Sequence, residues 1–191
     1  MDTANVTITI RDAVAADAPF IARCVWAAIE MLHIEDDVPD EMREAFSYLV
    51  GICLMDDTLY SYRNAAVAEV DGCVVGALVA YDGARYAAMR KTTFDLVEKN
   101  MGVKLEHNAM ETGEGEFYLD SLAVMPQFRG LNIGKMLIQN RMELARGLGI
   151  GKVSILVDKD KPRLQAYYES LGLALAEEIF VFNSWYNKLV K

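Results

Sequence analysis

Residues 119–137, LDSLAVMPQFRGLNIGKML, contain what a phosphate-binding site requires. A predicted strand is ended by Pro126, and apolar residues at helical spacing then predict a helix. A helix N-terminus presents unpaired backbone N–H groups and roughly half a positive charge. Gly130 and Gly134 leave room for a pyrophosphate to approach that end. We therefore interpret this stretch as a site for a phosphate-containing ligand.

Two common phosphate motifs do not fit this stretch. A Walker loop requires Gly-Lys-Ser/Thr, whereas Gly134 and Lys135 are followed here by Met136. A Rossmann fingerprint requires three glycines at fixed spacing, which the stretch lacks. The ligand is therefore expected to belong to another class of phosphate-containing molecule.

The stretch resembles motif A of the GNAT superfamily of N-acetyltransferases, in which a strand ending in Leu-Ala-Val leads through Pro to Arg/Gln-x-x-Gly-x-Gly/Ala at a helix start. The matching residues are Leu122, Ala123, Val124, Pro126 and the run 129–134, RGLNIG. Asn132 stands where the family usually has Gly, and asparagine is enriched among the non-glycine residues that adopt a positive φ. The resemblance implies acetyl-coenzyme A as the co-substrate.

A second segment, AYYESLGL at 166–173, resembles the family's Leu-Tyr-Glu-Lys-Leu-Gly-Phe signature near coenzyme A. Residues 117–175 match closely, whereas the first half agrees only in its order of strand, two helices and hairpin. That variable half is where the family sets acceptor choice. Lys161 stands where many members carry an Asn that contacts the pantetheine arm, so that contact is not transferred.

The resemblance also implies how the cofactor is held. The backbone of Leu122 and Val124, with Ala123 between them, would pair with the pantetheine arm, and the Val124 amide would polarise the thioester carbonyl. An ordinary loop-to-helix turn is the alternative for the glycine stretch, and the second motif argues against it. The backbone N–H groups expected to face the pyrophosphate are those of Arg129, Gly130, Asn132, Ile133, Gly134 and Lys135.

Acetyl transfer from a thioester to an amine requires a proton for the departing thiolate. The resemblance places the hydroxyl of Tyr168 near the sulfur, and a phenol with a pKa of about 10 can donate to a thiolate. The alternative is an aromatic side chain that fills the core. Tyr167 points about 100° away round the helix and is the weaker candidate.

Asp120 precedes Leu122 by two residues and shares its strand face if no bulge intervenes. Acids at this position in polyamine-type members face the acceptor amine, so Asp120 is expected to bind the amine or to accept its proton. Direct abstraction requires a raised pKa or a water relay, because carboxylates are weak bases at pH 7. Glu116 and Tyr118 are reserve candidates.

The remaining elements must position these residues. Asp17 is expected to cap a helix, and Asp71-Gly72 predicts a tight hairpin turn. With the resemblance, the pattern predicts one mixed α/β domain over 1–191 whose strongly curved, mostly antiparallel sheet of six to seven strands is flanked by about five helices. Strands are predicted at 6–10, 66–70, 73–81, 117–125, 153–157, 179–182 and 185–190, and helices after Asp17 and at 41–54, 84–101, 133–148 and 162–171.

Composition and charge limit the kinds of partner and ligand that we expect. The net charge of −9 disfavours nucleic acid and favours a cationic substrate, unless it only keeps the protein soluble. The 3 Cys residues fit neither a disulfide framework nor a zinc knuckle and are read as buried thiols. His33 and His107 are isolated, so no metal is expected. No signal peptide or long apolar run is present, which predicts a cytoplasmic protein without membrane contact.

The expected activity is transfer of an acetyl group to a primary amine, most simply a small cationic amine, through a tetrahedral intermediate. A protein N-terminal or lysine acetyltransferase is an alternative within enzymes. A non-catalytic acetyl-coenzyme A sensor or structural module is the alternative outside them. A homodimer is expected from the apolar closing strands, which contain Ile179, Phe180, Val181, Phe182, Trp185 and Tyr186.

Overall fold

The computed structural model describes residues 7–103, 105 and 109–191. Within them, seven strands form one sheet in the order β1-β2-β3-β4-β5-β7-β6. Each neighbouring pair is antiparallel except β4 and β5, which run parallel. The predicted mixed α/β class with a mostly antiparallel sheet is confirmed. The strands are β1 Ile8–Asp12, β2 Ala65–Val70, β3 Cys73–Asp82, β4 Glu116–Val124, β5 Lys152–Asp158, β6 Ala174–Val181 and β7 Ser184–Val190.

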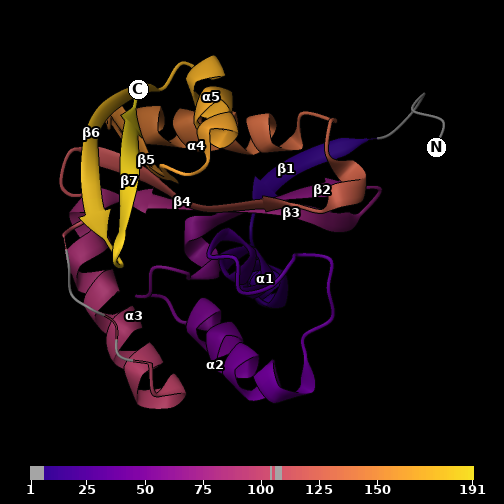
Figure 1. The fold of residues 1–191 in the computed structure, drawn as a ribbon. Helices are drawn as coiled ribbons and strands as arrows, with labels where there is room; N and C mark the ends of the chain where they lie inside the picture. The colour runs from indigo at the N-terminus through magenta and orange to yellow at the C-terminus, as the bar shows by residue number, and fades with distance from the viewer. Residues whose placement is uncertain (1–6, 104, 106–108) are drawn as a thin grey trace.

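Helices cover both faces of the sheet (Figure 1). One face packs against α1, α2 and α3, and its core includes the fully buried Trp26 and Tyr86. The other face packs against α4 and α5 around Phe117 and Leu137. No helix among the described residues is long and apolar enough to cross a membrane. The five α-helices of the described part are α1 Ala18–Ala28, α2 Arg43–Leu54, α3 Tyr86–Met101, α4 Ile133–Gly147 and α5 Pro162–Ser170.

The hairpin between β2 and β3 follows the turn chemistry of its sequence. Asp71 and Gly72 both adopt positive φ angles, 51° and 81°, as a type I′ turn requires. The α1 start differs from its prediction, because Asp17 occupies the N-cap position without a capping hydrogen bond from its side chain. That carboxylate pairs instead with Arg11, at 2.7 Å. Asp17 therefore ties β1 to the start of α1.

Three further expectations need correction. Strand β1 runs to Asp12, and Val6 of the predicted strand lies outside the described residues. Strand β6 begins at Ala174, well before the predicted 179, because its pairing with β7 extends that far. The sequence did not indicate this part of the strand, because its side chains are exposed and show no alternation. Cys24 and Cys53 are buried as predicted, but Cys73 is exposed at the first position of β3, beside the hairpin turn.

The pairing of β4 changes along its length. It pairs with β3 from Phe117 to Val124, but with β5 only as far as Leu119. The β3 register also shifts opposite Asp120, which is the extra residue of a β-bulge. The condition for Asp120 to share a face with Leu122 is therefore not met. Beyond the bulge, the β5 side of β4 is open.

Candidate functional site

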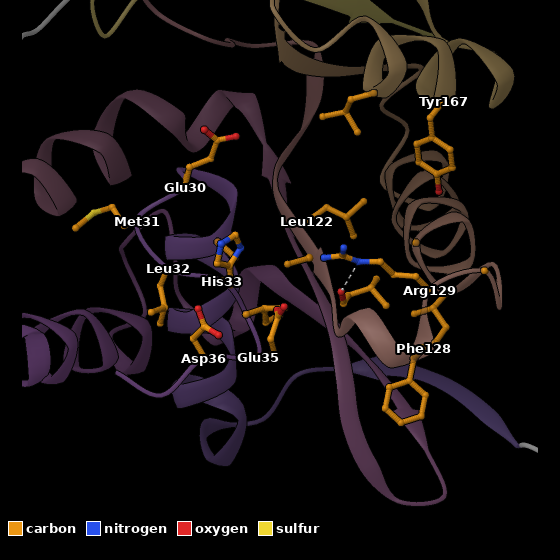
Figure 2. Close-up of a pocket in the computed structure, with 18 of the residues that line it drawn as sticks. Glu30, Met31, Leu32, His33, Glu35, Asp36, Leu122, Phe128, Arg129 and Tyr167 are labelled. Atoms are coloured by element: carbon orange, nitrogen blue, oxygen red, sulfur yellow. Dashed lines mark hydrogen bonds between the residues drawn. The ribbon is translucent and has the colours of Figure 1, made fainter. Parts of the chain in front are cut away.

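The backbone of the last β4 residues faces the opening between β4 and β5. The amide of Met125 donates to Val75 of β3 at 2.8 Å, so the preceding residue points its backbone groups the other way. The Val124 carbonyl accepts instead from Nε of Arg129, at 3.2 Å (Figure 2). By the same alternation, the N–H and C=O of Leu122 also face the opening. An extended amide chain could pair with this free strand edge.

Beyond β4, the loop presents its backbone as the phosphate interpretation requires. Asn132 has a φ of 60° and Gly130 a φ of 84°, so asparagine adopts the conformation for which the family usually has glycine. The first amide of α4 that finds a backbone acceptor is that of Met136, which donates to the Asn132 carbonyl at 3.0 Å. Among the described residues, the amides of Ile133, Gly134 and Lys135 have no such acceptor. They form an anion cradle at a helix N-terminus.

These features line one cavity of about 1020 Å³. Eight of the nine residues predicted to bind the cofactor line it, and Lys135 does not. Gly134 matters for the space available, because a Cβ at this position would lie 3.1 Å from the Tyr167 hydroxyl. The eight are Leu122, Ala123, Val124, Arg129, Gly130, Asn132, Ile133 and Gly134.

The wall opposite β4 is the segment that follows α1, residues 30–36. Figure 2 shows its side chains across the opening from Arg129 and Tyr167. Glu30, which adopts a φ of 59°, forms an ion pair with Lys161 at the N-cap of α5. This pair joins the two walls at one end of the cavity. Sequence reasoning did not identify this wall.

The two candidate tyrosines of α5 occupy different places. Tyr167 lines the cavity and, in Figure 2, extends from α5 toward α4. Tyr168 is only 4% exposed and belongs to the core on the α4 face of the sheet. Burial raises the pKa of Tyr168 well above its ordinary value, with smaller contributions from Tyr167 and Cys24. The phenol therefore keeps its proton at neutral pH.

Asp120 lies outside the cavity lining, at the bulge two residues before Leu122. Its Oδ2 accepts from the Tyr81 hydroxyl at 2.6 Å and its Oδ1 from Ser121 at 2.7 Å. Burial and then the charge of Glu111 raise the pKa of Asp120 to about 6, although these two hydrogen bonds oppose the rise. A carboxylate with this pKa can exchange a proton near neutral pH. Sequence reasoning did not identify Glu111 or Tyr81.

No group of three or more His, Cys, Asp or Glu side chains suited to a metal ion occurs in the described part of the chain. His33 is exposed and lines the cavity, and His107 lies outside the described residues.

Comparison with known proteins is consistent with this geometry. The model of the acetyltransferase (GNAT) family matches residues 26–173, a range that includes both sequence motifs. A crystal structure of an acetyltransferase is 26% identical, with a TM-score of 0.75, over 96% of this chain and 98% of that one. No match was found among curated proteins.

Two more distant structures share the fold. The N-acetyltransferase from Staphylococcus aureus Mu50 is 20% identical, with a TM-score of 0.76, over 96% of this chain and 100% of that one. The PaiA N-acetyltransferase from Thermoplasma acidophilum, solved in complex with coenzyme A, is 14% identical, with a TM-score of 0.59, over 97% of this chain and 98% of that one.

Proposed function

The chain belongs to the acetyltransferase (GNAT) family, and we propose that it transfers the acetyl group of acetyl-coenzyme A to the primary amine of a small cationic molecule. The observation that carries the proposal is the cavity, in which a free strand edge meets a helix N-terminus with unpaired amides. Such a site suits a ligand with both an amide-containing arm and a pyrophosphate. Coenzyme A has both.

In this proposal the amides at the start of α4 hold the pyrophosphate, and the backbone of Leu122 and Val124 pairs with the pantetheine arm. Gly130 and Gly134 keep the approach clear of side chains. The Val124 amide, which faces the opening, would stabilise the oxyanion that forms on the thioester carbonyl. Bound acetyl-coenzyme A supplies the acetyl thioester.

The acceptor would bind at the Asp120 end of the opening. Asp120 takes a proton from the acceptor ammonium, and the neutral amine then attacks the thioester carbonyl carbon. A C–N bond forms and the C–S bond breaks by way of a tetrahedral intermediate. Tyr168 donates the proton that the leaving thiolate takes up, and its phenolate then takes the second proton that the nitrogen loses as the amide forms. Tyr167, which lines the cavity, is the second candidate for this donor.

A small cationic acceptor is supported by charge. Glu35 and Asp36 line one wall of the cavity, and the chain carries a net charge of −9. Such a surface attracts cations and disfavours anionic acceptors. A protein N-terminus or lysine is the competing acceptor within enzymes.

Incubating the protein with acetyl-coenzyme A and a panel of amines, and measuring release of free thiol, tests the proposal. We expect turnover with small cationic amines and little with anionic ones. Preference for peptides would indicate a protein acetyltransferase. Tight binding of acetyl-coenzyme A without turnover across the panel would contradict an enzymatic role and favour a sensor.

We also propose a homodimer that covers the exposed face of the closing hairpin. Phe180 is 44% exposed and Trp185 51%, and their rings lie 5.4 Å apart. Strand β6 is also an edge of the sheet. Exposed aromatic surface at a sheet edge is commonly covered by a partner. Sedimentation should give about twice the mass of the chain, and a purely monomeric species would contradict the dimer.

A further inference from the structure

A second carboxylate, that of Glu111, acts on Asp120, and three tyrosines hold the two carboxylates between them. The hydroxyls of Tyr86 and Tyr118 donate to the two carboxylate oxygens of Glu111, at 2.7 and 2.8 Å. The third tyrosine, Tyr81, donates to Asp120 at 2.6 Å. Both carboxylate oxygens of Glu111 thus accept a hydrogen bond from a tyrosine hydroxyl, and so does one carboxylate oxygen of Asp120.

The three rings form one block. Tyr81 lies 5.8 Å from Tyr118 and 6.2 Å from Tyr86 between ring centroids, and Tyr86 and Tyr118 lie 6.4 Å apart. None of the three residues is more than 3% exposed. They come from β3, β4 and α3, so the block fixes Glu111 of the α3–β4 loop relative to Asp120 of the bulge. The separation of the two carboxylates is therefore set by packed aromatic rings.

Neither carboxylate is neutralised within the described residues, where no Lys, Arg or His nitrogen lies within 4.0 Å of either one. Arg90 is the cation whose charge reaches this cluster, since it acts on the Tyr86 hydroxyl. Its guanidinium lies over the Phe94 ring at 4.5 Å and pairs with neither carboxylate. Phenols donate hydrogen bonds without cancelling charge. Neither negative charge is therefore cancelled by a paired cation.

The other titratable groups near the two carboxylates keep their protons. The pKa of each tyrosine and of the Cys24 thiol is raised, first by burial, so these groups stay neutral through the range in which Asp120 titrates. Besides Asp120, the charged groups of the cluster are Glu111, which acts on Asp120, and Arg90, which acts on Tyr86. The neutral groups that sense Asp120, Glu111 or both are Cys24 of α1, Tyr60, Tyr81, Tyr86, Tyr118 and Tyr186 of β7.

Resting on the function proposed above, we infer that Glu111 is a positioning residue of the acceptor site, whose fixed negative charge beside Asp120 makes Asp120 the proton acceptor for the amine near neutral pH. A like charge at short range disfavours the ionised carboxylate and so increases its affinity for a proton. The same charge favours an acceptor that carries a second ammonium group. The reaction needs no other base in this arrangement.

The pH dependence of kcat/KM tests this role, with butylamine as the probe. In wild type the acid limb should report a group that titrates near pH 6. Glu111→Gln keeps an acceptor oxygen but removes the charge, so the limb should move about one pH unit lower. A limb that stays in place would contradict the inference, since loss of structure alone changes the rate without moving the limb.

Two variants separate charge from structure. Glu111→Asp keeps the charge, so its acid limb should stay within a few tenths of a pH unit of wild type. Glu114→Gln makes the same charge change at an exposed position of the same loop and should leave the limb in place. With 1,4-diaminobutane, Glu111→Gln should lose about tenfold more kcat/KM than it loses with butylamine. Equal losses with the two amines would contradict the selectivity.

A measurement on wild type does not depend on these variants folding. With the side-chain carboxyl carbons labelled with ¹³C, the Asp120 signal should titrate near pH 6. A single step at the ordinary pKa of aspartate would overturn the inference. If no amine is acetylated while Asp120 titrates near pH 6, the proposed function fails and the effect of Glu111 on Asp120 stands.

Discussion

Strand β4 carries two carboxylate centres that the protein treats in opposite ways. At its start, Glu116 accepts from Lys152 at 2.7 Å and from Lys188 at 2.8 Å. At its bulge, Asp120 faces Glu111 and phenols, with no cation paired to either among the described residues. The first centre is neutralised and the second is left charged.

The pKa values express the difference. Burial opposes ionisation at both centres, but the two lysines and Ser154 lower the pKa of Glu116 to about 2. Without such partners, the pKa of Asp120 rises to about 6. A neutralised carboxylate stabilises the fold, whereas an unneutralised one stays ready to exchange protons. Glu116, a reserve candidate from the sequence, is therefore assigned to stability.

The largest expected effect is that of Asp120→Asn on catalysis. Loss of a positioned base should lower kcat/KM by about 10²- to 10⁴-fold in the thiol-release assay. The folded-state pKa near 6 exceeds the ordinary 3.8, so ionisation costs stability as pH rises through that window. Asparagine lacks this cost, so the Tm at pH 8 should equal or exceed that of wild type. A large fall in Tm of Asp120→Asn with unchanged kcat/KM would contradict the assignment of Asp120 to catalysis and indicate a role in stability.

Glu116→Gln should act on stability. It leaves Lys188, whose side chain is 7% exposed, without its main partner, and should cost about 3–5 kcal/mol in urea unfolding. Because the folded-state pKa is about 2 against 4.5, this stability is present above pH 4.5 and is lost as pH falls toward 2. Glu177→Gln is the control, since Glu177 is 59% exposed and lies 3.6 Å from Lys188. Equal effects of the two variants would contradict the account.

Tyr168→Phe and Tyr167→Phe decide which phenol protonates the thiolate. If Tyr168 is the acid, its replacement should lower kcat by at least about tenfold and leave coenzyme A affinity near wild type. Tyr167→Phe should then change kcat little. The reverse pattern would assign the role of proton donor to Tyr167, which lines the cavity.

Gly134→Val should weaken coenzyme A binding by about tenfold or more without unfolding the protein. The valine side chain would enter the space in front of the α4 amides, because a Cβ at this position already lies 3.1 Å from the Tyr167 hydroxyl. The fold should persist, because valine lowers helix stability by less than about 1 kcal/mol. Gly147→Val is a matched control at the other end of α4, where a Cβ meets nothing within 4 Å. Isothermal titration with coenzyme A should show weaker binding for Gly134→Val and normal binding for Gly147→Val. Equal affinities of the two variants would indicate that the pyrophosphate binds elsewhere.

The residues that line the cavity on β4 and at the start of α4 were predictable because their information is local. A strand, a proline and small residues before a helix fall within 119–137, and eight of the nine residues named from that pattern line the cavity. Even Asn132 takes the positive φ that its position requires. Most strands and helices were predictable for the same reason, since period and turn residues are read within a few positions.

The cluster of tyrosines and carboxylates around Asp120 was not predictable because its residues are far apart in sequence. Tyr81, Tyr86, Glu111 and Tyr118 come from four elements, and only the packed sheet brings them together. The bulge at Asp120 depends on register with β3, which the β4 sequence alone does not encode. Strand β6 was underestimated because exposed residues at a sheet edge show no alternation.

A crystal structure with coenzyme A bound tests the central claim most directly, because it locates both ends of the site at once. We expect the pyrophosphate within hydrogen-bonding distance of the amides of Ile133, Gly134 and Lys135. The pantetheine arm should run along the free edge of β4 with its thiol directed toward Asp120. Coenzyme A bound away from the α4 N-terminus, or with its thiol directed away from Asp120, would contradict the proposed acetyl transfer.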